Sequence, residues 1–147
     1  MTGRVRAIGI NHVALEVDDI DAALEWWSRF FHFQLRGRRR TMAWIDLGDQ
    51  FVALSAPRSQ PADDGRHFGL VVDDKERLRV ALQEAGVPVA ASGSLRVRDP
   101  WSNIIEVVDY HDIQFTKAPG VLRGMGLDGL DKSDAALDEL RAKGLTD

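Results

Sequence analysis

The sequence has no cysteine, no long apolar run and no excess of positive charge, and each absence excludes a class of protein. Without cysteine, disulfide scaffolds, zinc fingers, iron–sulfur clusters and thiol catalysis are excluded. A formal net charge of −4 offers no domain-wide basic field to hold nucleic acid. No stretch approaches about 18 consecutive apolar residues, so we expect no membrane span. The N-terminus, MTGRVRAIGI, lacks the features of a signal peptide, and we expect a cytoplasmic protein.

An internal repeat organises the chain. Residues 12–19 read HVALEVDD and residues 67–74 read HFGLVVDD, with five of the eight positions identical. Each copy continues into a helical pattern and then into strand-like segments. One half of about 50 residues is too small to bury its own sheet face, so the two halves should pair into one unit.

The periodicity predicts a strand, a helix and three further strands in each half. For the first half we expect a strand at about 7–17, a helix at 20–33 and strands at 35–40, 42–47 and 50–55. A polar linker follows at 57–65. For the second half we expect a strand at 66–72, a helix at 75–85 and strands at 88–91, 94–98 and 103–109. Asp18 or Asp19 should cap the first helix, and Asp74 the second.

These elements predict an α+β fold, with two paired βαβββ modules forming a curved mixed sheet around a concavity and the helices outside. We expect residues 1–115 to form a single domain made of two repeats, at about 7–56 and 65–110. Residues 116–147 read as a C-terminal tail with a short helix.

Three chemically compatible side chains share one predicted face. Period-two alternation places His12, His67 and Glu106 on the sides of their strands away from the helices. Two imidazoles and one carboxylate suit a divalent ion and leave coordination positions open. A histidine on a strand is more often a packed or hydrogen-bonded side chain. Because both histidines occupy the same place in the repeat, we favour a metal site.

The sequence resembles the vicinal oxygen chelate superfamily, the fold of glyoxalases, bleomycin resistance proteins and extradiol dioxygenases. The segments GINHVALEVDD, RHFGLVVDD and DPWSNIIEVVDY carry the resemblance, which covers about residues 7–110. It implies that His12, His67 and Glu106 bind one divalent ion, which could be Fe, Mn, Zn, Ni or Co. It also implies a homodimer, although the sequence leaves open whether modules pair within one chain or between chains.

Several positions depart from particular members of that superfamily. The strand that carries a fourth ligand in glyoxalase I-like members reads DQFVALSA, in which only Gln50 could ligate, through a shifted register. Arg96 stands where extradiol dioxygenases have a tyrosine, and Ala14 where fosfomycin-resistance proteins have a threonine. Ser102 replaces the glycine of the closing signature.

We therefore expect a metal-dependent enzyme, of lyase, isomerase or dioxygenase type, acting as a Lewis acid on a small molecule with vicinal oxygens. Position alone nominates His111, Tyr110 and Glu16 for proton transfer. Arg96, Arg98 and Trp44 are candidates for substrate binding, although strand arginines are often solvated and a tryptophan is often core. One alternative is a metal-free protein that binds a drug or metabolite, as bleomycin resistance proteins do. Another is a metal-containing protein whose enzymatic role has been lost or is regulatory.

Overall fold

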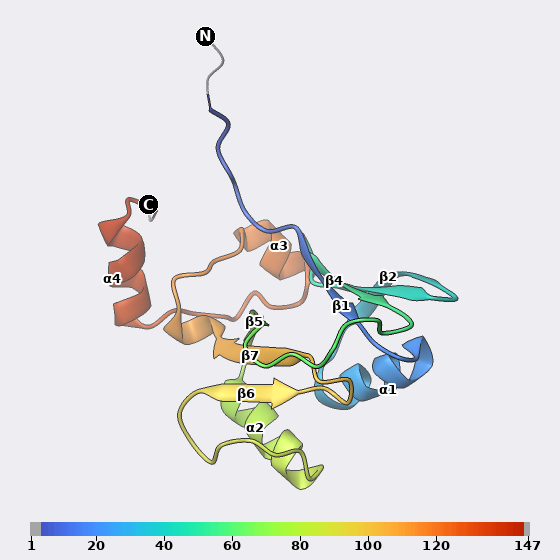
Figure 1. Cartoon of the computed structure of the whole chain (residues 1–147). Helices are drawn as coiled ribbons and strands as arrows, with labels where there is room; N and C mark the ends of the chain where they lie inside the picture. Colours follow the sequence, from blue (N-terminus) through green and yellow to red (C-terminus); the bar gives the residue numbers. More distant parts are fainter. Residues whose placement is uncertain (1–3, 146–147) are drawn as a thin grey trace.

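The computed structural model describes residues 4–145, in which two strand–helix–strand modules follow one another (Figure 1). The first module contains β1 (His12–Glu16), α1 (Ile20–Phe30), β2 (Gln34–Arg39), β3 (Met42–Asp46) and β4 (Phe51–Ser55). The second contains β5 (His67–Val72), α2 (Lys75–Glu84), β6 (Leu95–Arg98) and β7 (Ile104–Asp109). The predicted α+β class is confirmed.

Each module forms its own mixed sheet. The first sheet has the strand order β1-β4-β3-β2, and the second has the order β5-β7-β6. In both, the strand before the helix pairs in parallel with the last strand of the module. The remaining neighbours are antiparallel. The repeat seen in the sequence is therefore a repeat of strand pairing as well.

The strand expected at 88–91 does not form, so the second sheet has three strands among the described residues. Gly86, at φ +75°, turns the chain after α2, and Val87 N–H bonds back to Leu82. The buried Arg79 then donates to the carbonyl of Ala90 at 2.6 Å and to that of Gly93. This guanidinium satisfies loop carbonyls that a strand partner would otherwise take.

The first strand is shorter than expected. It spans His12–Glu16, whereas residues 4–11 form no strand and leave the body of the molecule as an extended segment (Figure 1). Val5 and Ile8 on that segment are 95% and 96% exposed. Apolar side chains in an extended segment usually pack on a neighbouring strand, and within residues 4–145 Val5 and Ile8 have no such cover.

The repeated Asp-Asp pair ends each first strand and begins each helix. Asp19 accepts a hydrogen bond from Ala22 N–H at 2.8 Å, and Asp74 accepts one from Arg77 N–H at 3.0 Å. Each aspartate caps an otherwise unpaired helical N–H group. The predicted caps are confirmed, and they fix where both helices leave their strands.

One hydrophobic core runs through both modules. Trp27 and Ile20 of α1 and Leu82 of α2 are buried in it together with strand residues such as Leu54 and Leu95. The opposite faces of the two sheets, which carry His12 in one module and His67 in the other, remain partly open. The core thus holds both sheets in place and leaves the faces that carry His12 and His67 uncovered.

The linker between the modules is held by buried hydrogen bonds. Arg58 donates to the side-chain oxygen of Asn103 at 2.6 Å and to the carbonyl of Glu16 at 3.2 Å. The side-chain amide of Asn103 donates to the Glu16 carbonyl at 2.9 Å and to the Asp99 carboxylate at 2.7 Å. This network ties β1 of the first module to the β6–β7 turn of the second.

The C-terminal segment packs against the end of the second sheet. It contains a 3₁₀ turn (Tyr110–Asp112), α3 (Pro119–Gly124) and α4 (Asp134–Ala142), the last capped by Ser133. Lys132 donates to the carbonyls of Tyr110, Ile113 and Phe115 and so holds the segment against the end of β7. No helix among residues 4–145 is both long and apolar enough to cross a membrane.

Replacing Asn103 by alanine should lower the free energy of unfolding by about 2–4 kcal/mol, because Arg58 and Asp99 would lose a buried partner. Urea denaturation of the purified protein measures the change. The control is Gln83→Ala on the exposed side of α2, for which we expect a change below about 0.5 kcal/mol. Equal effects of the two substitutions would contradict the role given to the network.

Candidate functional site

His67 and Glu106 meet on the open face of the second sheet. In the parallel pairing of β5 with β7, His67 lies beside Ile104 and Gly69 lies beside Glu106. The two side chains therefore occupy neighbouring rungs on the same face. The Nε2 atom of His67 is 3.2 Å from the Oε2 atom of Glu106, and about a third of each side chain is exposed. These two members of the predicted metal set are brought together.

The imidazole of His67 is oriented by the backbone. Its Nδ1 atom is 2.9 Å from the carbonyl oxygen of Gly65. Because a carbonyl only accepts, Nδ1–H is the donor in this bond, and Nε2 is the ring nitrogen that faces Glu106. Histidines that bind metals are commonly oriented in this way by a second hydrogen bond.

His12 lies apart from this pair within the chain but has the same local arrangement. Its Nδ1 atom is 2.9 Å from the side-chain oxygen of Asn11, and its ring stacks on Phe51 with centroids 4.6 Å apart. Across residues 4–145, no three metal-binding side chains of the histidine or carboxylate type converge. Within a single chain, the three predicted metal ligands are therefore divided into the His67–Glu106 pair and the separate His12.

The donor chemistry fits a divalent ion. Two atoms bound to one ion at about 2.1 Å lie roughly 3.0–3.4 Å apart when their angle is between about 90° and 110°. The 3.2 Å between Nε2 and Oε2 falls in that range. With the Nδ1 atoms of both His67 and His12 hydrogen-bonded, each Nε2 atom is the nitrogen left for an ion.

The predicted substrate-binding residues divide between the two faces. Arg96 of β6 pairs with Glu106 across the strands, and its Nη2 atom is 3.3 Å from the Glu106 carboxylate. Arg98, two residues further along, donates to the carbonyl of Asp63 at 2.6 Å. Trp44 lies on the face of the first sheet that carries His12. His12 pairs with Phe51 on β4, Trp44 pairs with Ala53, and residues two apart on β4 point to the same face.

An arginine-lined surface lies beside Trp44 at the edge of the first sheet. The guanidinium of Arg36 lies 4.6 Å from the Phe51 ring centroid, and that of Arg39 lies 5.9 Å from the Trp44 ring. Together with Gly37 they border a shallow hollow on this face. The basic run at 36–40 falls in the edge strand β2 and the turn that follows it, and its aromatic partners can be found only from the strand register.

The three residues nominated for proton transfer lie in three different surroundings. The Glu16 carboxylate accepts from Ser59 N–H at 2.9 Å, from the Ser59 hydroxyl at 2.8 Å and from Gln60 N–H at 3.0 Å. These bonds, led by the one from Ser59 N–H, lower the pKa of Glu16. Glu16 therefore holds the linker in the structure described here, and its catalytic assignment stays a prediction.

Tyr110 and His111 follow β7 at the far end from His67. The buried Tyr110 has its hydroxyl 3.0 Å from that of Thr116. His111 is exposed and bonds to Asp131 at 3.0 Å, and this hydrogen bond raises the pKa of His111. Neither residue is brought to the His67–Glu106 pair, and their roles in proton transfer also stay predictions.

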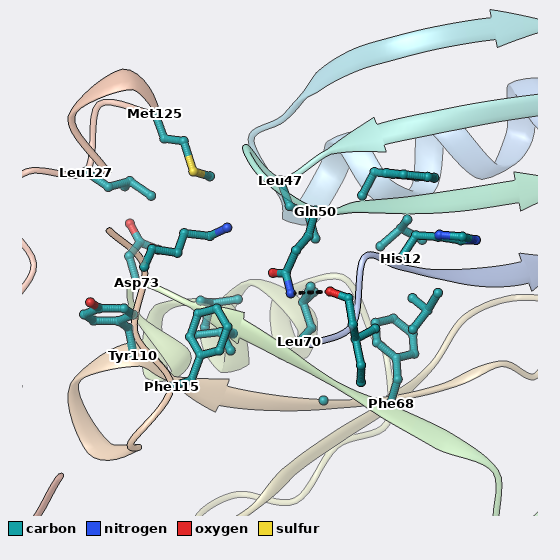
Figure 2. A pocket seen from close by; sticks show the side chains of 18 of the residues that line it. His12, Leu47, Gln50, Phe68, Leu70, Asp73, Tyr110, Phe115, Met125 and Leu127 are labelled. Atoms are coloured by element: carbon teal, nitrogen blue, oxygen red, sulfur yellow. Dashed lines mark hydrogen bonds between the residues drawn. The ribbon is translucent and has the colours of Figure 1, made fainter. Parts of the chain in front are cut away.

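A cavity of about 540 Å³ separates the N-terminal end of β1 from β5 (Figure 2). Met125 and Leu127 of the C-terminal segment point into it from one side, and Leu47 and Gln50 from the other. The Gln50 amide donates to the Ile10 carbonyl at 2.9 Å, and the His12 imidazole points away from the cavity. The walls supplied by the C-terminal segment gave no signal in the sequence beyond scattered apolar residues.

The sequence profile of the Glyoxalase/Bleomycin resistance protein/Dioxygenase superfamily matches residues 9–107. The chain belongs to this superfamily. The match contains both modules together with His12, His67 and Glu106, and it ends before the C-terminal segment that lines the cavity.

Among curated proteins, the chain is similar to a glutathione transferase FosA from Serratia marcescens, with 29% identity over 87 residues. That match covers 54% of this chain and spans 62% of the length of the FosA protein.

Two solved structures show the same fold. One is a protein assigned to the glyoxalase family from Bacillus anthracis, with a TM-score of 0.62 and 18% identity over 73% of this chain and 98% of that one. The other is a mutant of the fosfomycin resistance protein FosX from Listeria monocytogenes, solved with Mn(II) and 1S,2S-dihydroxypropylphosphonic acid. Its TM-score is 0.58 at 12% identity, over 67% of this chain and 89% of that chain.

Replacing Glu16 by glutamine should flatten the loss of stability in acid. Because the folded protein lowers the pKa of Glu16, its contribution is present above the ordinary value of 4.5 and is lost as the pH falls through the lower, folded value. Melting temperatures measured from pH 6 down to about pH 3 check this. Glu25→Gln, on the exposed side of α1, is the control. A wild-type profile for Glu16→Gln would contradict the linker contact.

Proposed function

We propose that this superfamily member is a divalent-metal-dependent enzyme whose metal site is completed by a second copy of the chain. His67 and Glu106 of one subunit and His12 of the partner subunit would hold the ion. The observation that carries the proposal is the 3.2 Å contact between Nε2 of His67 and Oε2 of Glu106, with the third expected donor elsewhere in the chain.

The surroundings of His12 support this assignment. Its ring is held like that of His67, with Nδ1 bonded to an oxygen and Nε2 left as the donor. Both β1 and β5 are edge strands, so each sheet has a free side next to its histidine. Edge strands and exposed apolar residues such as Ile8 and Ile10 favour association with another copy. The homodimer expected from the sequence would therefore be part of the site.

When bound, the ion, one of Fe, Mn, Zn, Ni or Co, would act as a Lewis acid toward two neighbouring oxygens of a small-molecule substrate. The chain supplies three ligands, which leaves positions open for these oxygens. Arg96 and Arg98 would bind an anionic part of the substrate, because both lie on the face that carries Glu106. Trp44 would reach the same space from the partner subunit, because it shares a face with His12.

The manganese complex of the Listeria relative supports this class of chemistry, since its phosphonic acid carries hydroxyls on neighbouring carbons. The reaction type stays open between lyase, isomerase and dioxygenase. His111 and Tyr110 remain proposed proton-transfer residues. Both follow the far end of β7, so they could transfer a proton only to a substrate long enough to reach from the His67–Glu106 pair to that end.

A second candidate is a metal-free protein that binds a drug or metabolite. The observation in its favour is the cavity of about 540 Å³ with predominantly apolar walls, a size that suits a small organic molecule. In that case His67 and Glu106 would form a hydrogen-bonded surface pair with Arg96, and ligand binding would not depend on any metal.

The proposed function is tested by Mn²⁺ and Zn²⁺ titration of the untagged, chelator-treated protein in a calorimeter. The wild type should bind about one ion per chain, and His67→Ala and His12→Ala should each lose about tenfold or more in affinity while keeping their fold. His32→Ala removes an exposed histidine outside the site and is the matched control. Retention of wild-type affinity in His67→Ala would contradict the proposal, and loss in His67→Ala alone would remove His12 from the site.

A further inference from the structure

Arg96 lies against both donor atoms of the His67–Glu106 pair. Its Nη2 atom is 3.3 Å from Oε2 of Glu106, 3.3 Å from Nε2 of His67 and 3.4 Å from Nδ1. Cross-strand pairing with Glu106 fixes its backbone position on β6. A positively charged nitrogen thus occupies the space beside the two atoms that an ion would bind.

A guanidinium and a divalent ion cannot both use these atoms. An ion bound to Nε2 of His67 and Oε2 of Glu106 would lie where the Arg96 guanidinium contacts both side chains. The positive guanidinium also repels a cation at close range.

We propose that Arg96 is an internal competitor of the metal and that its displaced guanidinium binds an anion next to the ion. This inference rests on the proposed function and specifies its substrate class: small oxyanions, such as phosphonates or carboxylates, that carry a further oxygen for the ion. Metal and anion then bind cooperatively, because each favours the displaced position of Arg96.

The charges on this face support the anion. With Arg96 displaced, the ion, Arg96 and Glu106 together carry a net positive charge on a half-exposed surface. Arg96 loses the carboxylate partner that it has in the structure, since Glu106 is then bound to the ion. Arg98 adds a second guanidinium on the same face of β6. An oxyanion bonded to Arg96 and to the ion replaces the lost ion pair.

The experiment compares wild type, Arg96→Met and Arg77→Met by Mn²⁺ titration with and without inorganic phosphate, with free Mn²⁺ corrected for the part bound to phosphate. Arg77→Met removes the same charge from the exposed surface of α2, where the guanidinium pairs with Asp73 and not with the His67–Glu106 pair. Without phosphate, Arg96→Met should bind Mn²⁺ about tenfold tighter than wild type. Phosphate should tighten Mn²⁺ binding by about fivefold or more in wild type and in Arg77→Met, but not in Arg96→Met.

Each outcome decides the inference. Tighter Mn²⁺ binding in Arg96→Met, with the phosphate effect lost, supports it, and so does binding in Arg96→Met when the wild type binds none. Equal affinities in wild type and Arg96→Met overturn the competitor role while leaving the proposed metal site intact. Equal gains in Arg96→Met and Arg77→Met also overturn it, because the effect is then one of net charge. If no variant binds Mn²⁺, the proposed function fails as well. Circular dichroism checks that each variant is folded. Arg96→Gln, which also removes the charge but keeps a polar side chain, should give the same result as Arg96→Met.

Discussion

The parallel pairing of the first and last strands of each module is the constraint on which the site depends. In the second module this pairing puts His67 and Glu106 on adjacent rungs of one face. In the first module the same pairing puts His12 beside Phe51. A one-residue slip in either register would turn these side chains toward the helices. The core residues on the opposite faces, such as Leu54 and Ile105, prevent that slip because it would expose them.

Much of this arrangement is readable from the sequence, because strand alternation has a period of two and the repeat marks equivalent positions. The faces of His12, His67 and Glu106 and the Asp19 and Asp74 caps follow from that pattern. The loop at 88–94 does not, because its conformation depends on the buried Arg79, a residue that the sequence presents as an ordinary helical surface charge. The contacts of Arg96 and of Glu16 are likewise invisible without the cross-strand register and the path of the linker.

The C-terminal segment adds something that the superfamily match does not contain. Its anchors are the Lys132 ammonium on three backbone carbonyls and the close contact of Gly48 with Met125. Burial lowers the pKa of Lys132. The glycine-rich sequence of this segment has no periodicity that predicts such packing. Its apolar side chains line the cavity between the modules, and β5, including His67, lines the same cavity.

In the proposed function, the two open faces of one chain carry complementary parts of one metal site, so association of two copies is the central claim. Co-expressing His12→Ala chains with His67→Ala chains, each with a different tag, tests it most directly. In a heterodimer, His12 of one chain and the His67–Glu106 pair of the other are both intact. The doubly tagged fraction should therefore bind about one Mn²⁺ per dimer with wild-type affinity, whereas each parent binds about tenfold or more weakly. A doubly tagged dimer with no more Mn²⁺ than its parents would show that the site does not form between chains.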